Sequence, residues 1–215
     1  MGEDVDYRLG QDVFSRDDKH VGSLQAVIAD RDTFKARALV VKETRWFSGH
    51  VLSPGSSLLT DEVAIPLESV ASRTHDRIDL ALSSAQIRQL PPYLTYQYHP
   101  LTPGEVAEEG LMHLSGESLA VGLEETAAKS SAEIEISENE NVMLPGADRL
   151  GTVKELLYDG DVFIGVVLRP GGFFKREVIL PRRFLERGDD LALFAKLTPE
   201  DVEKLQPFEP EEPGR

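Results

Sequence analysis

The same order of short segments occurs twice in this sequence, and this duplication restricts the fold more than any other feature. Each copy contains a glycine that follows a turn, strand-length apolar segments, a segment that ends in Ile-Pro or Leu-Pro, an alternating segment and a short capped helix. Strand-length segments divided by turns at short intervals are typical of all-β sandwiches and barrels. The repeat therefore predicts an all-β protein with two small β-barrels in tandem, each followed by a short helix.

The first copy shows its strands by alternation and by turn residues. Ile78 and Leu80 alternate with Arg77 and Asp79, which is the pattern of a strand with one buried face. Pro66 ends an earlier segment, because a residue without an N–H group belongs at an edge or an end of a strand. The expected strands of this copy are 12–14, 23–29, 36–42, 62–66 and 77–82, and a short helix capped by serine is expected at 83–90.

The second copy repeats these features in the same order. Leu180-Pro181 corresponds to Ile65-Pro66, and Thr198 with Pro199 supplies an N-cap and a first helical residue. The expected strands are 133–136, 142–144, 150–153, 162–168, 175–181 and 190–193, and the expected helix is 198–205. Gly22 and Gly151 occupy equivalent places where a turn leads into a strand, which predicts either a positive φ or a close backbone approach.

An acidic segment lies between the two copies. Residues 101–149 contain 11 Asp and Glu against 2 Lys and Arg, so 11 − 2 gives this segment a net charge of −9 out of −15 for the whole chain. The expected organisation is a first barrel domain at 7–100, an acidic flexible linker at 101–132, a second barrel domain at 133–208 and an acidic tail at 209–215. A partner-docking segment that orders on binding is the alternative interpretation of the linker.

Composition excludes several classes of protein. The chain has no cysteine, so disulfides, zinc–cysteine sites and thiol nucleophiles are excluded. The apolar stretch at 162–168 is strand-sized, whereas a helix needs ~20 residues to span a bilayer. The acidic N-terminus lacks the apolar region of a secretory signal. We expect a cytoplasmic protein without a transmembrane segment.

The residues that carry chemistry form no catalytic pattern. The five histidines lack the spacing of metal ligands, and the sequence contains no phosphate-binding glycine motif. The pairs Ser56-Ser57 and Ser83-Ser84 lack the setting of a nucleophile elbow and are interpreted as loop and cap residues. We therefore expect no enzymatic activity, no cofactor and no metal.

The duplicated order resembles the PRC-barrel family, named for the H subunit of the photosynthetic reaction centre. The residues that carry the resemblance in the first copy are Leu9-Gly10-Gln11-Asp12-Val13, Asp17 to Gly22, Asp30-Arg31-Asp32, Ala38 to Val41, Ala64-Ile65-Pro66, Val70 and Leu80-Ala81-Leu82. In the second copy they are Asp148 to Val153, Gly165 to Leu168, Ile179-Leu180-Pro181 and Leu191-Ala192-Leu193. The resemblance implies a small barrel fold and a function in binding other proteins. It implies no chemistry, because a fold by itself does not fix a function.

Two surfaces are candidates for partner binding, because loops and outer faces carry function in small barrels. Trp46 and Phe47 are apolar residues in an irregular segment, and they act either as an anchor for a partner or as a plug of the barrel. A basic set in the second copy lies among phenylalanines and consists of Lys175, Arg176, Arg182, Arg183 and Arg187. Three interpretations remain for this set: the outward residues of a strand, a docking face for an acidic partner or for the protein's own acidic linker, or contacts to RNA.

The sequence thus predicts a non-enzymatic protein-binding or assembly adaptor built on PRC-like barrels. The expected partner is another protein, which includes a member of a membrane-associated complex or a second copy of the chain. The alternative is an RNA- or ribosome-associated maturation factor, although an acidic chain carries the charge opposite to that of most nucleic-acid binders.

Overall fold

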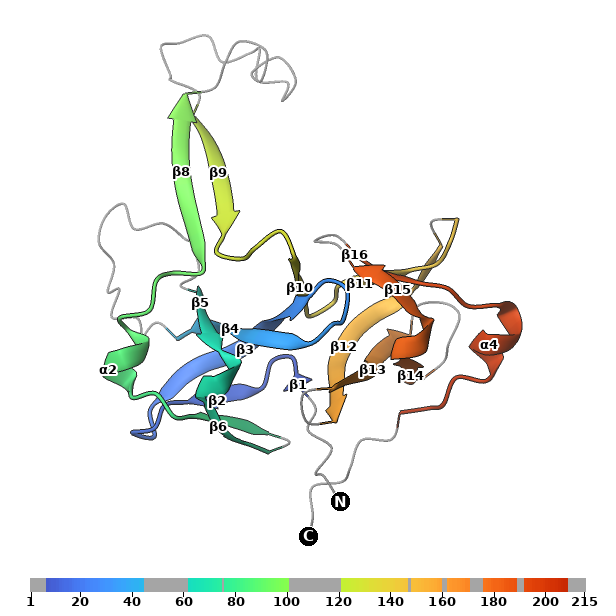
Figure 1. The fold of residues 1–215 in the computed structure, drawn as a ribbon, viewed down its shortest axis with the longest axis horizontal. Helices are drawn as coiled ribbons and strands as arrows, with labels where there is room; N and C mark the ends of the chain where they lie inside the picture. Colours follow the sequence, from blue (N-terminus) through green and yellow to red (C-terminus); the bar gives the residue numbers. More distant parts are fainter. Residues whose placement is uncertain are drawn as a thin grey trace.

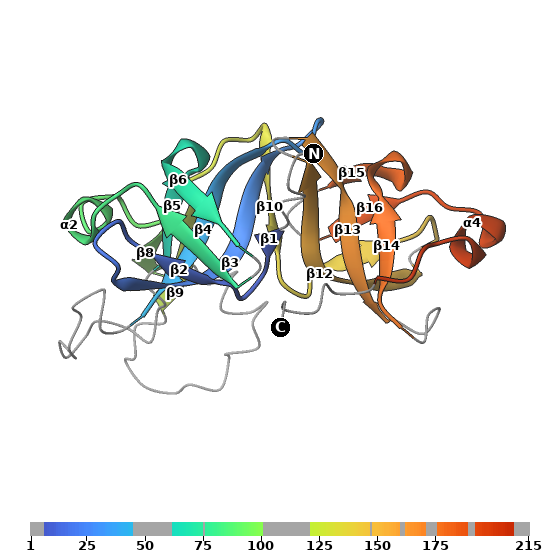
Figure 2. The same ribbon diagram turned by 90° about the horizontal axis from the view of Figure 1, so that it is seen from below.

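The computed structural model describes residues 7–44, 62–74, 76–100, 121–146, 148–159, 162–170, 176–188 and 192–208. Two mixed β-sheets of similar topology lie side by side, with the helices α2 (Ser84–Ile87) and α4 (Pro199–Glu203) at opposite ends (Figures 1 and 2). The expected fold class, all-β with two small barrels and one short helix after each, is confirmed.

The first barrel runs in the order β5-β4-β3-β2-β7-β6, and β2 and β7 are parallel. A 3₁₀ helix, η1 (Leu67–Ser69), links β5 to β6. The strands are β2 (Asp12–Phe14), β3 (His20–Asp30), β4 (Ala36–Glu43), β5 (Glu62–Pro66), β6 (Val70–Arg73) and β7 (Arg77–Leu80).

The second barrel has the corresponding order β14-β13-β12-β11-β16-β15, with β11 and β16 parallel. A second 3₁₀ helix, η2 (Arg182–Phe184), links β14 to β15 in the place of η1. The strands are β11 (Asn141–Met143), β12 (Arg149–Asp159), β13 (Val162–Pro170), β14 (Val178–Pro181), β15 (Leu185–Gly188) and β16 (Ala192–Ala195).

The long strand β3 contains a bulge that explains its irregular sequence pattern. Its pairing with β4 shifts between Leu24 and Ala26, so the strand changes the face that it presents to the core. Leu24 and Val27 are buried in the main core, whereas Ala26 and Ile28 belong to a separate cluster on the opposite face. A bulge therefore accounts for the loss of strict alternation after Leu24.

Two short strands cross between the barrels. β1 (Tyr7–Arg8) precedes the first barrel in sequence but pairs with β12 of the second, where Tyr7 faces Leu156. β10 (Glu133–Ser137) precedes the second barrel but pairs with β3 of the first, where Ile136 faces Val27. The two pairings occupy equivalent positions on β12 and β3, and Figure 2 shows both strands between the barrels. The barrels thus exchange strands reciprocally, as the protomers of a two-fold symmetric dimer do.

A continuous apolar core joins the barrels across this junction. Phe34, in the turn after β3, is fully buried and stacks on Phe163 of β13 with 5.2 Å between ring centroids. Phe34 has a φ of 61°, a conformation that costs a non-glycine residue energy. The Tyr158 hydroxyl donates to the Phe34 carbonyl oxygen at 3.1 Å, and burial raises the pKa of the Tyr158 phenol. The strain at Phe34 is offset by contacts that both barrels supply.

A two-stranded ribbon projects from the first barrel (Figure 1). It consists of β8 (Leu94–Pro100) and β9 (Val121–Ala127), which pair antiparallel from Leu94 opposite Ala127 to Pro100 opposite Val121. Part of the segment expected as linker, 121–127, is therefore a strand. Residues 101–120 of that segment and the expected tail 209–215 lie outside the described residues.

The close backbone approach expected at the equivalent glycines is confirmed. A Cβ on Gly151 would lie 2.8 Å from the Arg169 carbonyl oxygen, and a Cβ on Gly22 would lie closer still to the Lys42 carbonyl oxygen. The expected helix caps are also present, because Ser83 and Thr198 each accept a hydrogen bond from the third helical residue. Both helices therefore begin where the sequence places them.

Candidate partner-binding surfaces

The structure describes part of the predicted basic set. Arg176 and Arg183 are exposed, and the backbone of Arg187 lies in β15. Trp46, Phe47 and Lys175 lie outside the described residues, so their interpretation as an anchor, a plug or a basic rim remains a prediction.

Arg182 has a different environment from the one expected for an outward-facing residue. Its guanidinium lies 4.5 Å from the centre of the Phe34 ring and donates to the Asp32 carbonyl oxygen at 2.9 Å. It also donates to the Leu185 carbonyl oxygen at 2.6 Å. Since Asp32 and Phe34 belong to the first barrel, Arg182 holds the two barrels together.

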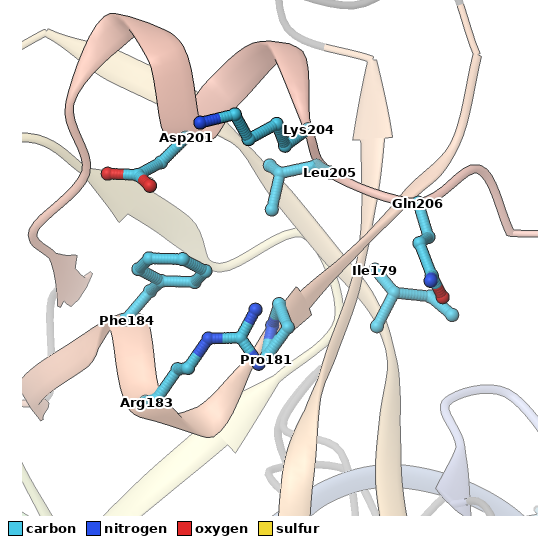
Figure 3. A pocket seen from close by; sticks show the side chains of 8 residues that line it. All are labelled: Ile179, Pro181, Arg183, Phe184, Asp201, Lys204, Leu205 and Gln206. Atoms are coloured by element: carbon cyan, nitrogen blue, oxygen red, sulfur yellow. The ribbon is translucent and has the colours of Figure 1, made fainter.

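Arg183, the next residue, lines a pocket beside α4 that we call the α4 pocket (Figure 3). Its cavity volume is about 220 Å³. Ile179, Pro181, Phe184 and Leu205 give it an apolar lining, and Arg183, Lys204, Gln206 and Asp201 give it a polar rim. The Arg183 guanidinium lies 4.7 Å from the centre of the Phe184 ring, and the Lys204 side chain is 73% exposed.

The charged groups at the rim of the α4 pocket differ in the hydrogen bonds and ion pairs that they make. The Asp201 carboxylate belongs to the capping box of α4, because it accepts from the Thr198 backbone N–H at 3.0 Å. It also accepts from the Thr198 hydroxyl at 2.6 Å, and this bond is the main reason that the pKa of Asp201 is lowered. Lys204 has a single long ion pair, at 3.7 Å to Glu200. Arg183 makes no hydrogen bond or ion pair with any described residue. Lys204 and Arg183 also lower the pKa of Asp201 through their charges, after the Thr198 bonds. Neither cation makes a short ion pair with Asp201, so both keep hydrogen-bond donors for a ligand.

The corresponding place in the first barrel has different side chains. Glu68 is the second residue of η1, as Arg183 is of η2, and Ser69 takes the position of Phe184. The first barrel therefore has neither the cation nor the aromatic ring at this place, although the backbone is the same. The α4 pocket is a property of the second barrel's side chains and not of the fold.

A larger open groove lies at the base of the ribbon, and we call it the ribbon groove. Its volume is about 810 Å³. It is lined by Gln25, Arg31, Glu62, Leu94, Thr126, Ala127, Lys129, Ser130, Ser131, Glu135 and Ser137. The spacing of these residues in the sequence gave no signal for the groove, because β3, β5, the ribbon and the exchanged strand β10 meet only in the folded chain.

Tyr93 packs on the outer face of the first barrel, next to the ribbon groove. This side chain is buried against Ala26, Ile28 and Val40. Its hydroxyl donates to the Glu135 carboxylate at 2.6 Å, and its backbone N–H donates to the Glu62 carbonyl oxygen at 2.7 Å. Tyr93 thereby closes the edge of β5 and ties it to the exchanged strand β10.

Asp17 joins the turn before β3 to the start of α2. Its carboxylate accepts from the Ser84 hydroxyl and from the Ser84 backbone N–H, both at 2.7 Å, and the Lys19 ammonium lies 3.1 Å away. The bonds from Ser84 hold the pKa of Asp17 well below its ordinary value. The cluster fixes the helix, which agrees with the interpretation of Ser83-Ser84 as cap residues.

Among the described residues, no three His, Asp or Glu side chains gather as a metal site would require. Within the same part of the chain, no helix is both long and apolar enough to cross a bilayer.

Comparison with known families identifies the first barrel. The model of the PRC-barrel domain family matches residues 9–86, so the chain contains one PRC-barrel domain at this position. The match ends within α2 and therefore covers the strands of the first barrel from β2 to β7. No curated protein matches the chain.

Proposed function

We propose that this chain is a non-enzymatic adaptor that binds another protein, with the α4 pocket as its main contact. In this proposal the second barrel is a second PRC-barrel copy, which has the same strand order as the first and the same reciprocal strand exchange. Two joined copies leave their outer faces and loops free to diverge, since the shared core fixes only the inner residues.

The single observation that carries the proposal is the α4 pocket with its available cations. An apolar lining beside an exposed Arg183 and Lys204 suits an apolar side chain with a carboxylate close to it. Arginine and aromatic residues in small pockets commonly carry the binding energy of protein interfaces. The match is therefore to an amphipathic, acidic segment of a partner protein.

The size of the α4 pocket favours a protein partner over a metabolite. Sites for drug-sized ligands usually have volumes of about 300–1,000 Å³. The volume of about 220 Å³ in this pocket suits one side chain. A single side chain that enters a pocket from a larger contact surface is the usual anchor of a protein interface.

Binding of RNA is the weaker alternative. Arg182 is engaged with Asp32 and Phe34 across the junction, so fewer arginines remain for phosphate contacts than the sequence suggests. Affinity for nucleic acid depends on the number of phosphates neutralised. The position of Arg182 therefore reduces the support for RNA and leaves the case for a protein partner unchanged.

The test compares three versions of the chain as bait in extract of the native organism, with and without ribonuclease. The versions are the unchanged chain, Arg183→Glu, and Arg16→Glu as a control on an exposed turn of the first barrel. We expect one protein to be retained by the unchanged chain and by Arg16→Glu. Its affinity for Arg183→Glu, measured with purified components, should fall by roughly tenfold or more.

Two results would contradict the proposal. Equal affinity of the partner for all three versions would exclude the α4 pocket as the contact. Retention that disappears with ribonuclease would favour the RNA-associated alternative.

A further inference from the structure

We propose that the ribbon groove of the first barrel is a second binding site, which takes an extended peptide segment with an acidic side chain. This inference rests on the proposal that the chain binds proteins, but it concerns a different surface from the α4 pocket. The groove lies on the first barrel between the ribbon base, β5 and β10, whereas the α4 pocket lies on the second barrel beside α4.

Arg31 is the residue that points to the charge of the ligand. Its backbone is fixed, because its N–H donates to the Ala132 carbonyl oxygen at 2.9 Å. Its Nε atom is buried and has no hydrogen-bond partner, and the side chain makes no ion pair with any described residue. The two Nη atoms of the same guanidinium also make no hydrogen bond with any described residue. Because the buried Nε is out of reach of a ligand, a ligand carboxylate would pair with these Nη atoms, in a charge-assisted arginine–carboxylate contact.

The remaining lining of the groove suits a peptide backbone. Gln25 and Ser131 make no side-chain hydrogen bond with any described residue, so an amide and a hydroxyl are available to peptide groups. Glu135 also lines the groove, but its carboxylate already accepts the Tyr93 hydroxyl. A lining that offers both donors and acceptors matches the alternating N–H and C=O groups of an extended chain.

The positions on the second barrel that are equivalent to Gln25 and Ala26 have charged side chains. There Lys154, in the position of Gln25, pairs with Glu177 at 2.8 Å and lies 3.5 Å from Glu155. Glu155 in turn lies 3.6 Å from Arg8 of the exchanged strand β1. The charges at this place on the second barrel are thus neutralised internally. Arg31 on the first barrel makes no ion pair with any described residue, although Glu62, Glu135 and Lys129 also line the ribbon groove.

The experiment selects binders from a displayed library of random peptides of roughly 10 residues, with the full chain as the target. Selected peptides are then measured against the unchanged chain, Arg31→Ala, Arg183→Glu and Arg16→Ala. Arg16→Ala is the matched control, because Arg16 is an exposed arginine in another turn of the first barrel. Thermal melts of each version check that the variants fold.

We expect a class of peptides that contain Asp or Glu and lose roughly tenfold in affinity with Arg31→Ala but not with Arg16→Ala. Replacing the peptide's Asp or Glu by Asn or Gln should reduce the affinity about as much as Arg31→Ala does. The peptide change combined with Arg31→Ala should reduce the affinity little more than either change alone. This non-additivity would place the carboxylate on Arg31.

Other outcomes decide between the two surfaces. Peptides that lose affinity with Arg183→Glu and not with Arg31→Ala would contradict the ribbon groove as a binding site and support the α4 pocket. Peptides that lose affinity with Arg31→Ala and not with Arg183→Glu would support the ribbon groove and count against the α4 pocket. Selection of no acidic peptide, or of peptides indifferent to both substitutions, would overturn the groove.

Discussion

The two barrels have nearly the same inner face and different outer faces. β3 and β12 have the same order of buried and half-buried residues up to their last position. At one equivalent place on the outer face, however, the first barrel has Ala26 and the second has Glu155. Tyr93 covers this place on the first barrel with an apolar contact, whereas Arg8 and Lys154 neutralise Glu155 on the second.

This difference shows which residues the fold constrains. Inward residues of both barrels contribute to one core, so a change in size there affects stability in both halves. Outward residues alternate with them along the same strands and are free to become polar or apolar. The ribbon groove lies on the first barrel and the α4 pocket lies on the second.

The largest effect is expected from Phe34→Ala, which tests whether the barrels form one cooperative unit. The substitution should lower the free energy of unfolding by about 3–5 kcal/mol, because it removes a buried ring that packs on Phe163 and lies under Arg182. Calorimetry should show one transition at a lower temperature. Val162→Ala, at a residue that is 65% exposed, should change stability by less than about 0.5 kcal/mol. Two separate transitions, with only one of them shifted, would contradict the shared core.

A smaller and graded effect is expected at the equivalent glycines. Gly22→Ala and Gly151→Ala should each destabilise the protein by about 1–3 kcal/mol, because the new methyl group meets a backbone carbonyl on the neighbouring strand. The loss should be larger for Gly22, where the approach is closer. Denaturant titration of both variants measures the difference, and unchanged midpoints for both would show that the strands separate easily at these places.

The smallest effect is expected from Asp17→Asn and depends on pH. The pKa of Asp17 is lowered in the folded chain by the bonds from Ser84, so the carboxylate stabilises the fold above its unfolded pKa of about 3.9. This contribution is lost as pH falls through the lower, folded pKa. The stability difference between the unchanged chain and the variant should therefore be greatest near neutral pH and shrink below pH ~4. The expected difference is small, since the group is exposed to solvent.

The control for this measurement is Asp76→Asn. Asp76 is exposed and has no hydrogen-bond partner among the described residues. Urea denaturation over a range of pH should give the same curve for this variant and the unchanged chain. A constant difference between Asp17→Asn and the unchanged chain down to the lowest pH would show that the charge of Asp17 contributes nothing.

Much of the secondary structure follows from local patterns. The segment expected at 62–66 is β5, and Ile78 and Leu80 are buried as their alternation predicts. The caps at Ser83 and Thr198 are present because each satisfies backbone N–H groups a few residues away. The alternation in β3 is lost after Leu24, but the bulge that causes this irregularity depends on the register with β4, which local patterns do not predict.

The candidate sites follow from the sequence only in part. The sequence places Arg183 in a basic cluster, but its neighbour Arg182 looks the same in the sequence and contacts the first barrel at the junction instead. Arg31 gave no signal of its own. Arg31 is a candidate because no carboxylate among the described residues pairs with it. The residues around it come from distant parts of the chain, so the sequence near Arg31 does not show this.

The sequence by itself determined the duplicated order of strands, the positions of the helix caps and the need for glycine at Gly22 and Gly151. These features depend on residues close in the chain or on a repeat that can be aligned by inspection. Only the tertiary structure decided that β1 pairs with the second barrel and β10 with the first, that a ribbon projects from the first barrel, and that the outer faces differ. The physical reason is that strand pairing joins backbone groups without regard to sequence distance, so Ile136 can pair with either barrel until the apolar faces at the junction select one.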